Sequence, residues 1–392
     1  MSAPRIQLVV KISKYCNLRC DYCYEFNELS DKTRISLANI ERMLRNLRSA
    51  IDAGKISGIE FIWHGGEPFL ISLDYYRKIG EFQGEIFSDR EDYQNFVQTN
   101  LTVLTDRHVE FLKSGNFFDR IGVSFDVFGG QRVDTKGKLR DGDVLVNMQK
   151  LIDHEIDFGA ISVLSRDTLG HAHQTQKFWE AMGMGFRFLP FHLSVDNAQS
   201  RKHGLSGQEQ VMALSNSFVD WLAAETPNRI DPVSEYLGYA LEFMANGART
   251  PYDPVANEIV YVVNVNGSIS GIGEGELYSP DLSYGNVFTT PFADVIESPV
   301  RRKASALGLA RMDRHCRFCP YFGYCPGHHM ADASTEDMRI IESNGCTVRH
   351  IVGFIVKTLE RSEIGEELNR RLRGEGNGAD AGTRGEVSRA LL

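Results

Sequence analysis

Short apolar runs alternate with amphipathic segments through the first half of the chain. After Ser36, a residue type favoured at helix N-caps, apolar side chains recur at helical spacing up to residue 51. Repeated units of this kind predict a parallel sheet covered by helices, an α/β fold. The runs expected to be strands are 6–12, 58–63, 94–98, 120–125, 157–164 and 186–191. The other helices expected between them are 73–87, 105–113, 143–154 and 171–182.

The second half of the chain shows a different pattern. Alternating residues on both sides of Asn266-Gly267 predict a β-hairpin, because Asn-Gly favours the tight turn that joins two strands. Ser206 and Asp231 are placed to cap two helices. After about residue 366 the chain is rich in glycine and poor in apolar residues, which predicts a disordered tail. The helices expected here are 206–225, 231–246, 291–307 and 351–361.

Composition excludes some classes of function. A chain of 392 residues suits two or three domains. Its net charge of −9 argues against a nucleic-acid partner, because phosphate binding needs a basic excess. No apolar run approaches the roughly 18 residues of a membrane helix, so no membrane association is expected. The N-terminus lacks the apolar core of a signal peptide, and the expected location is therefore cytoplasmic.

The seven cysteines fall into two groups. Cys16, Cys20 and Cys23 lie close together, the other four lie beyond residue 315, and none lies between. Clustering and an odd count speak against a disulfide framework and indicate two metal centres of three and four thiolates. Three thiolates can hold three corners of an iron–sulfur cube, with a fourth iron left open to another ligand. The spacing alone leaves a zinc site as an alternative, most clearly for the second group, Cys316, Cys319, Cys325 and Cys346.

The first cysteine group, with Tyr22 just before its third member, resembles the signature of the radical S-adenosylmethionine (radical SAM) enzymes. The resemblance implies a partial (β/α)6 TIM-like barrel with a 4Fe–4S cluster at the carboxyl end of its first strand. It also implies that SAM binds the open iron and that its reductive cleavage releases a 5′-deoxyadenosyl radical, which abstracts hydrogen from the substrate.

Several later segments resemble the SAM-binding motifs of that family. Gly-Gly-Glu-Pro follows the second strand, and Thr99-Asn100 and Ser124-Phe125-Asp126 follow the next two. The family has glycine where this chain has Leu101 and Val127. An arginine after the fourth strand often binds the SAM carboxylate; Arg132 and Arg140 both qualify, and Arg140 is slightly preferred. The residues expected at SAM are Tyr22, Gly65, Gly66, Glu67, Pro68, Asn100, Ser124, Arg140 and Leu189.

The four C-terminal cysteines and the hairpin resemble the SPASM or twitch extension, a small α+β domain that carries auxiliary 4Fe–4S clusters. Three cysteines of the full SPASM pattern are absent, and His329 stands at one of their positions. The resemblance therefore implies two 4Fe–4S clusters, one for SAM and one auxiliary. It leaves open whether His328 or His329 also binds iron. The expected division is a barrel at 1–230, a bridging and auxiliary-cluster region at 231–365, and a tail at 366–392.

Relatives with this extension mostly modify peptides, so the expected activity is the crosslinking of a side chain in a ribosomally made peptide. The alternative is oxidation or rearrangement of a sugar, nucleoside or aminoglycoside. Either reaction needs a reductant such as ferredoxin or flavodoxin. Loss of a proton from the substrate radical calls for an acid or base. The candidates are Asp126, His192 and Glu274, with Glu276 as a further possibility.

Overall fold

The computed structural model describes residues 3–87, 89–191, 198–224, 228–271, 282–333 and 335–361. Contacts divide the chain into two compact units. The first comprises Met1–Asp126, Gly130–Ile161 and Asp253–Leu309, and the second comprises Val127–Gly129, Ser162–Tyr252 and Ala310–Leu392. The expected domains are continuous stretches of chain with boundaries at residues 230 and 365, whereas each unit combines separate stretches. The expected boundaries remain predictions. The candidates His192, Glu274 and Glu276 and the tail at 366–392 lie outside the described ranges.

Five consecutive strands of the first unit pair in parallel, in the order in which they occur in the chain. The α/β prediction and these five strand predictions are confirmed. The carboxyl ends of the strands meet at one edge, where parallel α/β proteins place their chemistry. The strands are β1 (Arg5–Lys11), β2 (Gly58–His64), β3 (Tyr93–Thr99), β4 (Arg120–Ser124) and β5 (Phe158–Leu164).

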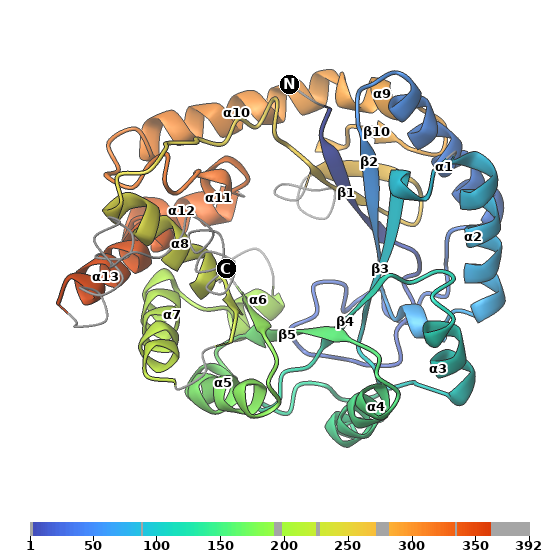
Figure 1. The fold of residues 1–392 in the computed structure, drawn as a ribbon, viewed down its shortest axis with the longest axis horizontal. Coiled ribbons are helices and arrows are strands. Elements are labelled where there is room, and N and C mark those ends of the chain that lie inside the picture. Colours follow the sequence, from blue (N-terminus) through green and yellow to red (C-terminus); the bar gives the residue numbers. More distant parts are fainter. Residues whose placement is uncertain are drawn as a thin grey trace, which may run out of the picture. The chain divides into compact units, whose positions relative to one another are not determined.

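Four helices lie on the outer side of these strands (Figure 1). The first begins as predicted, because the Ser36 side chain accepts a hydrogen bond from the backbone N–H of Asn39. Its stripe of Ile40, Met43, Leu44 and Leu47 is fully buried. The helices are α1 (Leu37–Asp52), α2 (Leu73–Ile86), α3 (Asp106–Lys113) and α4 (Asp141–Asp153).

The predicted hairpin forms from β8 (Val260–Val263) and β9 (Ser268–Gly271), and Gly267 takes a positive φ of 87° in its turn. Pattern reasoning did not anticipate that β8 pairs in parallel with β1 and so extends the sheet of the first unit. β10 (Gly285–Asn286) pairs with β9. The single helix predicted at 291–307 is wrong, because α9 (Phe292–Ile296) ends before Pro299, which opens α10 (Pro299–His315).

The second unit contains the short parallel pair β6 (Phe186–Pro190) and β7 (Ile230–Asp231) and is otherwise mostly helical. Ser206 caps its helix as predicted, in a capping box with Glu209. The prediction for Asp231 is wrong, because its carboxylate accepts from Arg229 and Pro232 stands at the N-cap. The helices are α5 (Ala172–Ala181), α6 (Ala198–His203), α7 (Gly207–Leu222), α8 (Val233–Met244), α11 (His328–Ala331), α12 (Thr335–Asn344) and α13 (Thr347–Arg361).

Among the described residues, no helix combines the length and apolar character needed to cross a lipid bilayer.

Candidate active site and second cysteine cavity

The first three cysteines lie in the loop that follows β1. All three are free thiols, and Cys16 and Cys20 are buried. Burial raises the pKa of Cys16 and of Cys23 to about 12, and the other thiols of the loop act on both in the same direction. A buried thiol with a raised pKa keeps its proton unless a metal stabilises the thiolate. The loop therefore presents three thiols that would ionise on binding a metal.

The Gly65-Gly66 pair brings the segment after β2 against the backbone of the cysteine loop. A Cβ atom on Gly66 would lie 2.2 Å from the carbonyl oxygen of Tyr15, and both glycines have positive φ. The backbone N–H of Glu67 donates to the same Tyr15 carbonyl at 2.9 Å. Two glycines are needed here because no side chain fits between the two backbones. This contact fixes the position of the loop that carries Cys16.

The Glu67 side chain points into the protein and clamps the end of β3. Its carboxylate accepts hydrogen bonds from the Phe69 N–H, the Thr99 hydroxyl and the Asn100 N–H, at 2.8, 2.6 and 2.7 Å. Burial raises the pKa of Glu67, and these donors act against that rise. Pro68 follows at the start of a short 3-10 helix, Pro68–Leu70. Because the carboxylate is occupied in this way, only the backbone of Gly-Gly-Glu-Pro remains available to a ligand.

Asn100 connects that clamp to the cysteine loop. Its side-chain nitrogen, Nδ2, lies 3.6 Å from the Cys16 sulfur and 3.1 Å from the side-chain oxygen of Asn17. The next residue, Leu101, has a φ of 52°, and Val127 has a φ of 41°. These are the two positions at which the motifs resembled above have glycine. The backbone therefore keeps the left-handed conformation at both positions although the side chains are apolar and bulky.

Tyr22, Asp126 and Arg132 form a buried polar group beside Cys20. The Tyr22 hydroxyl donates to the Asp126 carboxylate, and the Arg132 Nε atom pairs with the same carboxylate at 3.0 Å. Burial alone would lower the pKa of Arg132, but the Asp126 charge raises it overall. Arg132 in turn acts to lower the pKa of Cys20. A permanent positive charge thus lies next to one of the three thiols.

The surroundings of the other residues predicted to bind SAM do not point to a ligand. Arg140 pairs with Asp134 and Asp143, and its side chain is 29% exposed. The Ser124 hydroxyl accepts from the Gln98 amide at 2.7 Å, at the ends of β4 and β3. Leu189 is exposed on β6, in the second unit. The structure therefore brings Tyr22, Asp126 and Arg132 together with the cysteine loop, and it gives Arg140 other partners.

Sequence reasoning missed a second polar group at the same edge of the sheet. Lys11 and Glu25 form an ion pair at 3.0 Å, with each side chain less than a tenth exposed. Lys11 pairs in register with His64, whose Nδ1 accepts from the Gly65 N–H. Burial lowers the pKa of His64, so its ring is neutral with the proton on Nε2. The signal that could have shown this group is that Lys11 and His64 each end a strand, next to the cysteine loop and to Gly65-Gly66.

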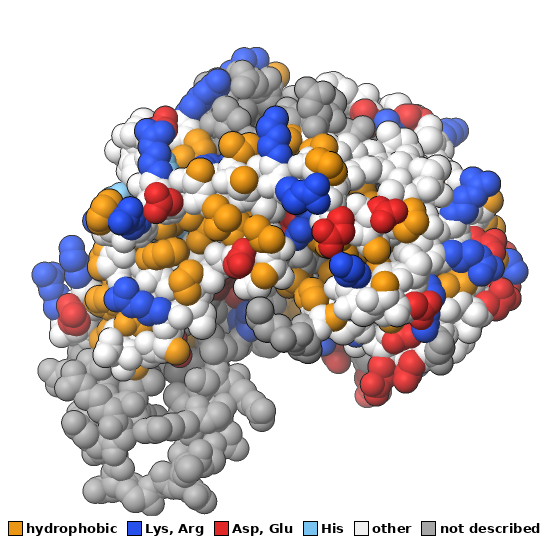
Figure 2. Space-filling view, turned by 90° about the horizontal axis from the view of Figure 1, so that it is seen from above, with side chains coloured by type: hydrophobic (Ala, Val, Ile, Leu, Met, Phe, Trp, Pro, Cys, Tyr) orange, Lys and Arg blue, Asp and Glu red, His pale blue; other side chains and the backbone are white. Residues whose placement is uncertain are grey.

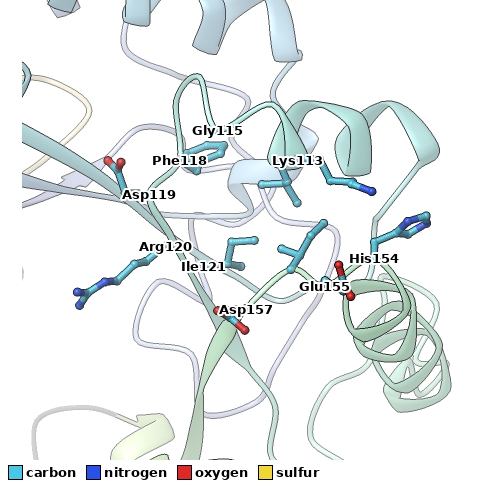
Figure 3. A pocket seen from close by; sticks show the side chains of 11 residues that line it. Lys113, Gly115, Phe118, Asp119, Arg120, Ile121, His154, Glu155 and Asp157 are labelled. Carbon is cyan, nitrogen blue, oxygen red and sulfur yellow. The ribbon is translucent and has the colours of Figure 1, made fainter.

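A cleft of about 500 Å³ lies at the opposite edge, where β4 and β5 begin (Figure 3). Charges of both signs line it, among them Lys113, His154, Glu155 and Asp157. Asp119 at its rim is engaged by Arg90 at 2.8 Å. Because the amino ends of parallel strands serve mainly stability, the size of this cleft does not make it the active site.

The four C-terminal cysteines line a single cavity of about 140 Å³ in the second unit. This is roughly ten times the space that one water molecule needs. Within the described residues, no three His, Cys, Asp or Glu side chains converge closely enough to hold a single metal ion. A cavity of this size with thiols on several sides has room for a polyatomic group such as an iron–sulfur cluster.

Apolar side chains and two histidines complete the lining of the second cavity. Cys316 packs against Met312, Met330 and Ala331, and burial raises its pKa to about 12. The His329 Nε2 atom lies 3.3 Å from the Cys346 sulfur, and burial lowers the pKa of His329 to about 3. His315 also faces the cavity.

The surface carries charged side chains of both signs. On the face shown in Figure 2, acidic and basic side chains are interspersed and apolar side chains lie between them. The exclusion of nucleic acid remains a prediction, and it rests on the net charge of −9.

Several known proteins are similar to this chain. The Radical SAM superfamily matches residues 10–178. The serine-type anaerobic sulfatase-maturating enzyme of Klebsiella pneumoniae is 26% identical over 199 residues, 50% of each chain. The cysteine-type enzyme of Clostridium novyi (strain NT) is 25% identical over 226 residues, 55% of this chain and 59% of that protein. The matches with these first relatives thus span only about half of their length. For the serine-type enzyme of Bacteroides thetaiotaomicron, identity is 22% over 83% of this chain and 82% of that protein.

Two solved structures extend the likeness to the fold. Native anSMEcpe with bound AdoMet and a Cp18Cys peptide gives a TM-score of 0.68 at 17% identity, covering 95% of this chain and all of that one. Streptococcus suis SuiB bound to S-adenosylmethionine gives 0.55 at 17% identity, covering 78% and 68%. The expected α/β fold is thereby confirmed. Residues 10–178 therefore match the Radical SAM superfamily, and the chain is similar to anaerobic sulfatase-maturating enzymes over about half of their length.

Proposed function

We propose that this protein uses SAM and two 4Fe–4S clusters to oxidise a side chain of a peptide. The observation that carries the proposal is that the chain has two separate groups of thiols, one of three cysteines in a polar loop and one of four that line a cavity. With the first cluster bound, SAM supplies a 5′-deoxyadenosyl radical that abstracts a hydrogen atom. Cys16, Cys20 and Cys23 would hold that cluster, with one iron left for SAM.

Arg132 is the better candidate for the SAM carboxylate. It lies beside Cys20, and a guanidinium binds a carboxylate with two parallel hydrogen bonds. Asp126 holds it from one side, which leaves the rest of the guanidinium fork for a second acceptor. Arg140, which the motif comparison slightly favoured, already has two acidic partners. The backbone carbonyls around Gly65 and Gly66 would accept from the SAM amino group.

Asp126 is better described as a positioning residue than as a base. Its carboxylate accepts a hydrogen bond from the Tyr22 hydroxyl and forms an ion pair with Arg132, so it holds these two side chains in place. Glu25 is the alternative acceptor for a substrate proton, because it lies two residues after Cys23 and belongs to the polar group that its ion pair with Lys11 forms at the same edge of the sheet. His64 would serve as an N–H donor, since its Nδ1 is already occupied.

The four C-terminal cysteines would hold the second cluster with all of its irons ligated. Such a cluster has no open iron for substrate, so its role would be to accept the electron that the substrate radical loses. A reductant such as ferredoxin or flavodoxin would supply the electron for SAM cleavage. Peptide substrates are favoured because the SuiB structure contains its precursor peptide SuiA and the anSMEcpe structure contains a peptide.

Within this class, two oxidations differ in their product. Crosslinking would join two side chains, and sulfatase maturation would convert a Ser or Cys. Crosslinking is preferred here because the resemblance to sulfatase-maturating enzymes implies a catalytic aspartate just after the missing cysteine that follows the hairpin. This chain has Gly273 at that position. The relatives that mature sulfatases support the second oxidation as the other candidate.

The first test is anaerobic purification with iron and sulfide counts in the wild type and in a Cys16/Cys20/Cys23→Ala variant. We expect about eight irons to fall to about four, with loss of 5′-deoxyadenosine formation. In the second test, the enzyme is incubated with SAM, a reductant and short peptides encoded beside the gene. We expect the mass of a substrate peptide to fall by two hydrogens. Conversion of sugars or nucleosides instead of peptides would contradict the peptide assignment. Absence of iron after reconstitution would contradict the whole proposal.

A further inference from the structure

The polar groups of the second cavity have a role that the four thiolates alone do not explain. The cavity wall is mostly apolar, with residues such as Met330, Ile341, Val348 and Val352. His315 and His329 bring imidazole rings into this wall, each from a helix end next to the cysteines. We infer that both histidines donate N–H hydrogen bonds to the sulfur atoms of the auxiliary cluster and thereby set its reduction potential. This inference rests on the proposed second cluster.

His329 makes the more direct contact. It lies in the first turn of α11, and its Nε2 atom is 3.3 Å from the Cys346 sulfur. A free thiol could donate its hydrogen to the ring, but a metal-bound thiolate has none to give. The contact can then persist as a hydrogen bond only if the imidazole donates. Binding of the cluster therefore fixes the proton of neutral His329 on Nε2.

His315 contributes a second nitrogen. It is the last residue of α10 and directly precedes Cys316. Its Nε2 atom is shielded from solvent and has no hydrogen-bond partner among the described residues. A buried ring nitrogen without a partner is unfavourable, and the sulfur atoms of a cluster in the same cavity would satisfy it.

Donated hydrogen bonds have a predictable effect on a cluster. Reduction adds negative charge that spreads onto the sulfurs, and N–H groups directed at the sulfurs stabilise that charge. The two histidines should therefore raise the reduction potential of the auxiliary cluster and make it a better electron acceptor. Arg349 also lines the cavity, and its positive charge acts in the same direction from an exposed position.

His328 provides a matched control. It is the neighbour of His329 in the chain, but its ring lies 3.8 Å from Glu235 and is not part of the cavity wall. A change at His328 would remove a neighbouring imidazole of the same helix without removing a donor to sulfur.

The experiment uses the full chain with the Cys16/Cys20/Cys23→Ala changes, so that only the second site can hold a cluster. Potentiometric titration followed by electron paramagnetic resonance is applied to this parent and to its His329→Leu, His315→Leu, His329→Gln and His328→Leu variants. We expect each of the first two to shift the reduction equilibrium about tenfold toward the oxidised form, about 59 mV for one electron. His329→Gln should recover part of the shift because it keeps an N–H donor, and His328→Leu should leave the potential unchanged.

A second measurement does not depend on the variants folding. In the parent labelled with ¹⁵N-histidine, pulsed electron paramagnetic resonance should detect weak nitrogen coupling of the kind that passes through a hydrogen bond. Strong coupling, with loss of iron in His329→Leu, would make His329 a ligand and overturn the inference. No coupling, or unchanged potentials in both leucine variants, would also overturn it. A parent without iron would instead contradict the proposed second cluster.

Discussion

The two groups of cysteines differ in what surrounds them. The first lies among buried charged groups, including Lys11, Glu25, Asp126 and Arg132, at the ends of parallel strands. The second lies in a cavity walled by apolar side chains at the ends of helices. Polar groups are costly to bury unless they are paired, so their concentration at the first site calls for an explanation.

The explanation follows from the number of thiols. A three-cysteine cluster leaves one iron open, and its ligand must be oriented by other residues, which requires charges and hydrogen-bond donors near the loop. A four-cysteine cluster needs no further ligand, so thiols and a tightly packed wall are sufficient. The contrast supports the proposed division, in which the first site would bind a polar cosubstrate and the second would store or pass an electron.

The largest effect is expected from Gly66→Ala. The added Cβ would overlap the Tyr15 carbonyl oxygen, and alanine would be strained at a φ of 51°. We expect loss of the first cluster and of SAM cleavage, with a fall in unfolding free energy of about 3 kcal/mol or more. Iron analysis and chemical denaturation measure both.

The control for that change is Gly54→Ala. Gly54 has a similar φ of 63°, but no atom lies within 4 Å of a Cβ placed there. Its cost should be about 1 kcal/mol, with both clusters retained. Equal effects of the two changes would mean that strain, and not the approach of the two backbones, determines the role of Gly66.

Cys346→Ala tests whether the two sites are separate. It removes one of four thiolates, so the iron content should fall from about eight to about four. Cleavage of SAM to 5′-deoxyadenosine should persist, since the first site is intact, while substrate oxidation is lost. Simultaneous loss of SAM cleavage in a folded variant would show that the two sites depend on each other.

Arg132→Lys should weaken SAM binding by roughly 10–100-fold, because an ammonium cannot form the paired hydrogen bonds of a guanidinium. Anaerobic equilibrium dialysis with SAM measures this effect. Arg140→Lys is the matched change and should alter affinity by no more than about twofold. The reverse order of the two effects would restore Arg140 as the carboxylate-binding residue.

Glu67→Gln should give the smallest effect of the series. The amide cannot accept from all three donors that hold the carboxylate, and its NH₂ group would face one of them. We expect the free energy of unfolding to fall by about 2 kcal/mol, with SAM affinity nearly unchanged. A large loss of SAM affinity without loss of stability would indicate that the side chain contacts the cosubstrate.

The sequence by itself determined the features that depend on local pattern and spacing. The strand and helix periods predicted the α/β fold, Ser36 and Ser206 capped their helices as expected, and the cysteine spacing separated a group of three from a group of four. These signals are readable because each depends on residues only a few positions apart. The helix-capping prediction failed for Asp231, because its carboxylate accepts a hydrogen bond from Arg229 instead.

Only the tertiary structure decided which distant residues meet. It placed Arg132 beside Cys20, gave Arg140 other partners, and joined Lys11 to Glu25 and His64. It also turned the Glu67 carboxylate toward β3, although the motif by itself does not say which way the side chain points. The physical reason is that burial, ion pairs and close backbone approach depend on packing between strands that lie tens of residues apart. Spacing along the chain does not record that packing.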